Sequence, residues 1–119
     1  MVVEIKRGKE LGAGELLVIN NGRRLEFGSK DLIEPSASNV NWEAIFFLLR
    51  GENEIVVAFG KLHQMKVVFQ GLEYPVYCIS TLVSLDKGKG YGRSVLKEME
   101  NYLRTQEKTA LGFCETELL

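Results

Sequence analysis

The strongest constraint on the fold of this chain is the stretch 83–104, where an apolar segment runs through a glycine-rich loop into an amphipathic helix. The loop reads Lys87-Gly88-Lys89-Gly90-Tyr91-Gly92-Arg93. Its three glycines let the backbone turn tightly, so that successive N–H groups can point at one anion. The first turn of the following helix adds free N–H groups and the positive end of the helix dipole. The pattern predicts a phosphate-binding loop at the carboxyl end of a strand.

Glycine-rich loops also occur in three other contexts. A nucleotide-binding P-loop is excluded, because that motif needs Gly-Lys-Ser/Thr and Gly92 is followed by Arg93-Ser94. A dinucleotide-binding fingerprint needs an acidic residue at the end of the next strand, which Glu115 could supply. A purely structural turn is the third alternative, and the last two stay open at this point.

The elements that follow the loop are well defined in the sequence. Apolar residues at helical spacing predict a helix over 92–106: Val95, Leu96, Met99, Tyr102 and Leu103. The apolar run 109–114 predicts a buried strand. A strand, a crossover helix and a second strand form a right-handed βαβ unit, so this last strand should run parallel to the one before the loop.

The first two thirds of the chain predict a strand over 2–6, a helical region over 9–27 interrupted near Gly22, and a loop over 28–42. An antiparallel meander follows, with strands at 44–50, 54–69 and 74–82, turns at 51–53 and 70–73, and Pro75 at the start of its third strand. The fold class is therefore α/β (α+β): one domain, 1–119, with a mixed sheet, an antiparallel meander followed by a βαβ unit, and helices on both faces.

Composition excludes several classes of function. The net charge is −1 and no basic run occurs outside the glycine loop, so a nucleic-acid-binding face is not indicated. No apolar run approaches the roughly 20 residues that span a bilayer, and the start of the chain lacks a signal peptide's apolar stretch, which predicts a cytoplasmic protein without a membrane partner. Cys78 and Cys114 are interpreted as small buried apolar residues, in preference to a disulfide. With one histidine, His63, and no zinc-like spacing, no metal is expected.

The spacing Lys87-x-x-Gly90-x-Gly92, after a strand and opening a helix, resembles the acetyl-CoA signature of the GCN5-related N-acetyltransferases (GNAT), Arg/Gln-x-x-Gly-x-Gly/Ala. The flanking segments Leu82-Val83-Ser84 and 94–99 match the end of that family's fourth strand and the start of its long helix. The order of elements matches over nearly the whole chain. The segments 41–43 and 67–71 also resemble the aminoglycoside 2'-N-acetyltransferase-like branch.

The resemblance implies that acetyl-CoA is the cosubstrate and that its acetyl group is transferred to a primary amine of a small molecule or protein by direct attack. It implies a backbone oxyanion donor at the N–H of Leu82. It also implies that residues of the strand and of the glycine loop bind the cosubstrate. The main chain of Thr81, Leu82 and Val83 would hold the pantetheine arm. The pyrophosphate would be bound by the loop and the first helical turn: Lys87, Gly88, Lys89, Gly90, Tyr91, Gly92, Arg93 and the hydroxyl of Ser94.

The general base is less well marked. The family often carries a glutamate on the fourth strand, near the position of Cys78 here, so Glu73 and Tyr77 become the candidates, with His63 and Glu115 as further alternatives. The family also continues with a helix and two strands, so the chain resembles a C-terminally short GNAT domain. An alternative is therefore a catalytically degenerate acetyl-CoA-binding sensor or interaction module. The Leu118-Leu119 end and an unpaired strand edge make a homodimer plausible; the sequence does not identify the acceptor amine.

Overall fold

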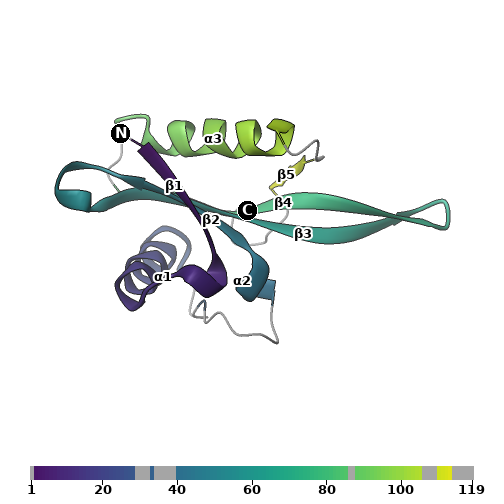
Figure 1. The fold of residues 1–119 in the computed structure, drawn as a ribbon, viewed down its shortest axis with the longest axis horizontal. Helices are drawn as coiled ribbons and strands as arrows, with labels where there is room; N and C mark the ends of the chain where they lie inside the picture. The colour runs from purple at the N-terminus through teal and green to yellow at the C-terminus, as the bar shows by residue number, and fades with distance from the viewer. Residues whose placement is uncertain (1, 29–32, 34–39, 86–87, 106–109, 114–119) are drawn as a thin grey trace.

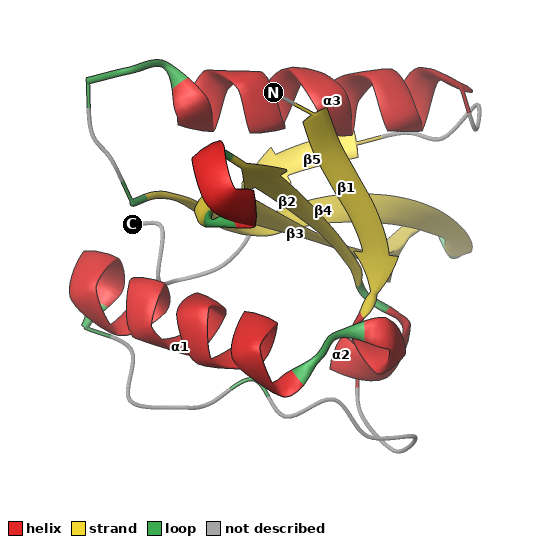
Figure 2. Ribbon diagram, turned by 60° about the vertical axis from the view of Figure 1, so that its left-hand side comes forward, coloured by secondary structure: helices red, strands yellow, loops and turns green. Residues whose placement is uncertain are grey.

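The computed structural model describes residues 2–28, 33, 40–85, 88–105 and 110–113. Five strands form one mixed sheet in the order β1-β2-β3-β4-β5. One helix, α3, lies across one face of the sheet, and α1 and α2 lie on the other face (Figures 1 and 2). The predicted fold class, with an antiparallel meander, a βαβ unit and helices on both faces, is confirmed.

The bounds of the elements follow the predicted order. The chain gives β1 (Val2–Arg7), a 3-10 turn at Gly8–Glu10, α1 (Ala13–Phe27), α2 (Val40–Glu43), β2 (Ile45–Arg50), a 3-10 turn at Glu52–Glu54, β3 (Val56–Phe69), β4 (Leu72–Ser84), α3 (Tyr91–Thr105) and β5 (Ala110–Phe113). β1 to β4 pair antiparallel in sequence, and β5 pairs parallel with β4. The crossover through α3 is therefore the predicted βαβ connection.

The predicted break of α1 near Gly22 is wrong, because the helix continues through that residue. Gly22 is buried, and a Cβ there would lie 2.8 Å from the ring of Phe59. The glycine therefore brings the helix close to the sheet, and this packing offsets its low helix propensity of about 1 kcal/mol relative to alanine. Gly28, with φ +67°, ends the helix in the left-handed conformation common at helix C-termini.

A network of charges fixes the start of α1 against the strands. The Glu15 carboxylate accepts a hydrogen bond from the N–H of Gly12 at 2.9 Å and one from Lys6 Nζ at 2.9 Å. It also contacts the guanidinium of Arg50, which reaches Glu4 at 3.0 Å. Burial raises the pKa of Glu15, but the Gly12 N–H and the Lys6 ammonium lower it more, so the pKa lies below its ordinary value.

Two apolar clusters fill the space between the sheet and its helices. On the α3 face, Val95, Met99 and Leu103 of the helix pack on the odd-numbered residues of β2 and on β3 and β4. On the α1 face, Ile19 and Phe59 pack with the even-numbered residues of β2. The central strand β2 is buried on both faces, which is why its sequence reads as a continuous apolar run.

The hairpin of β3 and β4 projects beyond the rest of the sheet (Figure 1). β2 pairs with β3 as far as Ile45–Leu62, and β5 joins β4 at Tyr77, so in the described part of the chain residues 63–69 of β3 pair only with β4, and residues 72–76 of β4 pair only with β3. We call these two segments the arm. Gln70 (φ 52°) and Gly71 (φ 79°) form its two-residue turn, shorter than the predicted turn over 70–73. Two positive φ angles are typical of a type I′ hairpin turn.

Pro75 and Cys78 correct two further expectations. Pro75 lies within β4, not at its start. It is tolerated there because Phe69–Leu72 closes the turn as a hydrogen-bonded pair, and the alternation of pairs makes Lys66–Pro75 a pair whose backbone donors point away from each other. Cys78 is fully buried, as expected, but its sulfur is disulfide-bonded. The parallel pairing of β4 with β5 brings the C-terminal part of the chain beside Cys78, a long-range contact that cysteine spacing alone does not reveal. Cys114 lies outside the described residues.

Candidate active site

The glycine loop lies between the end of β4 and the start of α3, as predicted. Gly88 and Gly90 have φ angles of +82° and +73°, which residues with a Cβ adopt only at a cost in free energy. A Cβ at either position would meet no atom within 4 Å, so the loop faces open space on that side. Its described residues can therefore accept a ligand that approaches the backbone closely. Lys87 lies outside the described residues.

The first turn of α3 carries the remaining predicted ligands of a phosphate. Tyr91, Gly92 and Arg93 are the first three helical residues, whose N–H groups have no acceptor within the helix. Lys89 and Arg93 are exposed beside them. Ser94 already uses both its donors, because its N–H and its hydroxyl donate to the carbonyl of Gly90 at 3.1 and 3.2 Å. Ser94 thus stabilises the loop, and the N–H groups of residues 91–93 are better placed for an anion.

The backbone of β4 next to this loop has one edge directed at β3 and one directed away from it. The N–H of Leu85, the residue after β4, donates to the carbonyl of Val57 in β3 at 2.8 Å, so Leu85 directs its backbone groups at β3. Successive residues of a strand direct their N–H and C=O groups at opposite edges. Val83 and Thr81 therefore also face β3, whereas Leu82 faces the opposite edge. Of the three main-chain sites predicted at 81–83, only Leu82 fits a ligand beside β4.

A β-bulge separates this edge from the part of β4 that pairs with β5. The register runs from Lys61–Thr81 directly to Leu62–Ile79, which leaves Ser80 as an extra residue in β4. The β4–β5 pairs that the structure describes end at Ile79–Phe113, one residue before the bulge. A bulge bends the strand and increases its twist locally. The Leu82 N–H therefore lies on a segment of β4 that diverges from the paired part of the strand and leads straight into the glycine loop.

The two candidate bases lie far from Leu82. Glu73 is nine residues away along β4, about 30 Å at 3.3 Å per residue, and is exposed in the arm. Tyr77 is five residues away, about 16 Å, and packs partly against the α3-side core. A general base must lie within hydrogen-bond reach of the proton, directly or through one water. Over these spans neither side chain lies directly beside the Leu82 N–H, and their role as bases stays a prediction. Glu115 lies outside the described residues.

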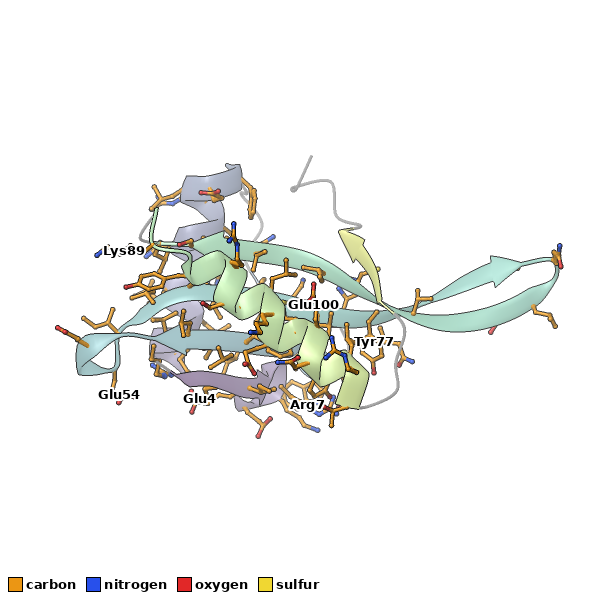
Figure 3. The ribbon with its side chains drawn as sticks, turned by 90° about the horizontal axis from the view of Figure 1, so that it is seen from above. Glu4, Arg7, Glu54, Tyr77, Lys89 and Glu100 are labelled. Atoms are coloured by element: carbon orange, nitrogen blue, oxygen red, sulfur yellow. The ribbon has the colours of Figure 1, made fainter. Side chains whose placement is uncertain are left out.

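Tyr77 and His63 instead line a cavity of about 460 Å³ at the base of the arm, together with Gln64, Arg7 and Glu43. Arg7 donates to the Glu43 carbonyl at 3.1 Å and lies 3.4 Å from its carboxylate. In the view of Figure 3, Arg7 and Tyr77 lie toward the other end of the molecule from Lys89. The cavity forms beside the last residue of β1 and the first residue of β2, where these two strands stop while β3 and β4 continue. We call it the notch; no sequence motif indicated it.

No three His, Cys, Asp or Glu side chains among the described residues are grouped so that they could hold a metal ion. No helix in the described segments has the length and apolar character needed to cross a bilayer.

Comparison with known proteins places the fold. No protein-family model and no curated protein matches the sequence. Among solved structures, the chain is similar to an aminoglycoside acetyltransferase from an uncultured soil metagenomic sample, in complex with sisomicin, with a TM-score of 0.69, 11% identity, and coverage of 97% of this chain and 78% of that one. It is also similar to an acetyltransferase from Vibrio fischeri, with a TM-score of 0.65, 10% identity, and coverage of 94% of both chains.

A third similar structure is a tetramutant of the BH1408 protein from Bacillus halodurans, with a TM-score of 0.63, 13% identity, and coverage of 96% of this chain and 82% of that one. At such low sequence identity these likenesses establish the fold. The chain has the GNAT-like fold of the two acetyltransferases described above, as the glycine loop and the order of its elements predicted.

Proposed function

We propose that this chain binds acetyl-CoA through its glycine loop and transfers the acetyl group to a primary amine of a small molecule or a protein. The observation that carries the proposal is the continuity of two features: the outward-facing backbone of Leu82 and, directly after it, a loop with two positive-φ glycines in open space before a helix N-terminus. The acetyltransferase fold of the similar structures supports the same function.

The residues present fit acetyl-CoA. The helix N-terminus, the backbone of residues 88–93 and two exposed cations, Lys89 and Arg93, would bind the pyrophosphate. Gly90 would admit the phosphates, because a side chain at this position would occupy the open space that they need. The pantetheine arm would pair with the outward-facing backbone of Ser84 and the carbonyl of Leu82, which leaves the Leu82 N–H for the acetyl group. Acetyl-CoA supplies the activated acetyl group as a thioester.

The chain's own contribution to chemistry would be the N–H of Leu82. It would donate to the carbonyl oxygen of the acetyl group, where negative charge develops as the amine attacks. Such a donor commonly contributes about 3 kcal/mol to transition-state stabilisation. The attacking amine must first lose a proton, since primary amines have pKa values near 10. With Glu73 and Tyr77 far from Leu82, that proton would leave through water or through residues beyond those described.

Calorimetric titration with acetyl-CoA, and with desulfo-CoA to isolate the phosphate contribution, tests the binding step. Gly90→Asp adds a carboxylate where the phosphates would lie, and we expect at least about a hundredfold loss of affinity from like-charge repulsion. Gly28→Asp is the matched control, because Gly28 also has a positive φ (+67°) and open space around it, at the far end of α1. Equal affinity of Gly90→Asp and Gly28→Asp would refute the site.

Release of free CoA thiol in the presence of an amine tests turnover. Leu82→Pro removes the N–H aimed at the open edge and leaves the β3–β4 ladder intact, so turnover should fall about a hundredfold with little change in acetyl-CoA affinity. Ser84→Pro, which also removes an outward N–H, should mainly weaken binding.

The distance of Glu73 and Tyr77 from Leu82 favours one second candidate, an acetyl-CoA-binding sensor without turnover. Tight binding without thiol release, across a panel of small amines and lysine peptides, would select that function over acetyl transfer.

A further inference from the structure

A second cavity, of about 480 Å³, lies between the N-terminal half of α3 and the first two strands. β1 begins beside this half of the helix (Figure 1). Seven residues line the cavity: Val3, Leu49, Lys89, Tyr91, Ser94, Lys97 and Glu98. We call it the β1 cavity. Lys89 and Tyr91 belong both to this lining and to the stretch 88–93 proposed above to bind the pyrophosphate, so the cavity adjoins that site.

The strand register shows on which side of the glycine loop the β1 cavity lies. Val3, Leu49, Ala58 and Ser84 are successive partners from β1 to β4, so they form one row across the sheet. A Cβ at Gly92, in the first turn of α3, would lie 3.8 Å from Ser84 Cβ, which places this turn above the β4 end of the row. Leu49 lies two strands further, about 10 Å at about 4.8 Å per strand. The helix N-terminus therefore lies between the outward edge of β4 and the β1 cavity.

We propose that the β1 cavity binds the 3'-phosphoadenosine end of acetyl-CoA, an inference that rests on the proposed function. In coenzyme A the pyrophosphate carries the pantetheine arm on one phosphorus and the ribose on the other. With the pyrophosphate at the helix N-terminus and the pantetheine arm on the β4 side, the ribose leaves from the other phosphorus, toward the β1 cavity. The ribose carries both the purine and the 3'-phosphate, so these two groups reach the lining of the cavity together.

Two lysines of the lining suit the 3'-phosphate. Lys89 and Lys97 are exposed at the cavity, and a phosphate monoester carries nearly two negative charges at neutral pH. Ammonium groups form short, charge-assisted hydrogen bonds with phosphate oxygens. Lys97 follows Tyr91 by six residues, about 9 Å along the helix axis at about 1.5 Å per residue. Its charge therefore extends the cationic region of the glycine loop along α3, past the pyrophosphate site.

The rest of the lining suits the purine. Leu49 is 2% exposed and Val3 is half-buried, so the cavity has an apolar floor. The half-buried ring of Tyr91 offers an aromatic surface on which a base can stack. The carboxylate of Glu98 accepts hydrogen bonds, which suits the amino group of adenine, and it repels a phosphate. The purine therefore lies beside Glu98 on the floor, and the 3'-phosphate lies at the exposed lysines.

Calorimetric titration of the chain with acetyl-CoA and with 3'-dephospho-acetyl-CoA, which lacks only the 3'-phosphate, tests the proposal. The wild-type chain should bind acetyl-CoA about tenfold more tightly than the dephospho form, because the charge-assisted contacts of the phosphate are lost. Lys97→Gln should reduce this ratio to about threefold, since its contact is with the 3'-phosphate.

Arg104→Gln is the matched control for charge. Arg104 is exposed and lies seven residues, about two helical turns, beyond Lys97 on the same side of α3. The substitution removes the same charge about 10 Å further along the helix, beyond the screening length of about 8 Å at physiological salt. The tenfold ratio should therefore be kept.

Val3→Phe tests the purine position independently of charge. The larger side chain fills the floor of the cavity from β1, a strand that contributes nothing to the glycine loop. It should weaken the binding of both acetyl-CoA and the dephospho form about tenfold, through the lost stacking of the base. Ile5→Phe, two residues along β1 and outside the lining, should leave both affinities unchanged. Circular dichroism and a cooperative melt establish that the variants are folded.

The outcomes separate this proposal from the proposed function. Equal affinity of the wild-type chain for acetyl-CoA and its dephospho form would overturn the proposal and leave the glycine loop as the acetyl-CoA site. Equal ratios in Lys97→Gln and Arg104→Gln would also overturn it, as would equal affinities of Val3→Phe and Ile5→Phe. Absence of binding by both forms would instead refute the proposed function, and this inference with it.

Discussion

Replacing Gly60 by alanine tests how closely α3 packs on the sheet. A Cβ at Gly60 of β3 would lie 2.9 Å from Met99 Sδ and 3.1 Å from Val95 Cγ1. Both helix residues are fully buried, so neither side chain can move into solvent. The whole helix or the strand must shift instead, and overpacking of this kind costs about 1–3 kcal/mol. We expect Gly60→Ala to lower the free energy of unfolding by that amount.

The matched control is the same substitution in open space. Gly14 lies in α1 with no atom within 4 Å of its Cβ position, so Gly14→Ala should stabilise the chain by about 1 kcal/mol through helix propensity. The two variants should therefore differ by about 2–4 kcal/mol, or roughly 10 °C in melting temperature for a domain of this size. Urea titration and thermal melts followed by circular dichroism measure the difference. Equal stability of the two variants would refute the inferred contact between α3 and β3.

Three further predictions concern packing and charge. A carboxyl with a lowered folded-state pKa stabilises the fold above its unfolded pKa near 4.5, and this contribution is lost as the pH falls through the folded value. Glu15→Gln should therefore lower the free energy of unfolding by about 2 kcal/mol at pH 7 and by progressively less below pH 4. Urea titrations at pH 7 and at a pH below 4 measure the two differences. Tyr102→Leu removes an edge-to-face contact with Phe47 at 5.7 Å and should cost about 1 kcal/mol in a thermal melt. Gly22→Ala should be less stable than Gly14→Ala, because its Cβ would meet Phe59 at 2.8 Å; equal melting temperatures would contradict this.

Local patterns account for the elements that the sequence predicted correctly. The helix at 91–105 and the loop before it follow from 3.6-residue periodicity and from glycines that the positive φ angles of residues 88 and 90 require. The parallel placement of β5 follows from the helix between the strands, because a crossover helix returns the chain to the end of the sheet at which β4 began. The break near Gly22 failed as a prediction because propensity describes an isolated helix, whereas here the ring of Phe59 occupies the space beside the glycine.

The candidate site also combines features that follow from local sequence with features that follow from long-range strand pairing. The sequence by itself determined the glycine loop, its cations and its position at the carboxyl end of a strand, because these depend on residues that are neighbours in the chain. The tertiary structure alone decided that Leu82 faces the open edge while Thr81 and Val83 face β3, that Glu73 and Tyr77 lie far from it, and that a notch forms beside the arm. Strand register and the points at which neighbouring strands end arise from long-range pairing, so no short stretch of sequence encodes them.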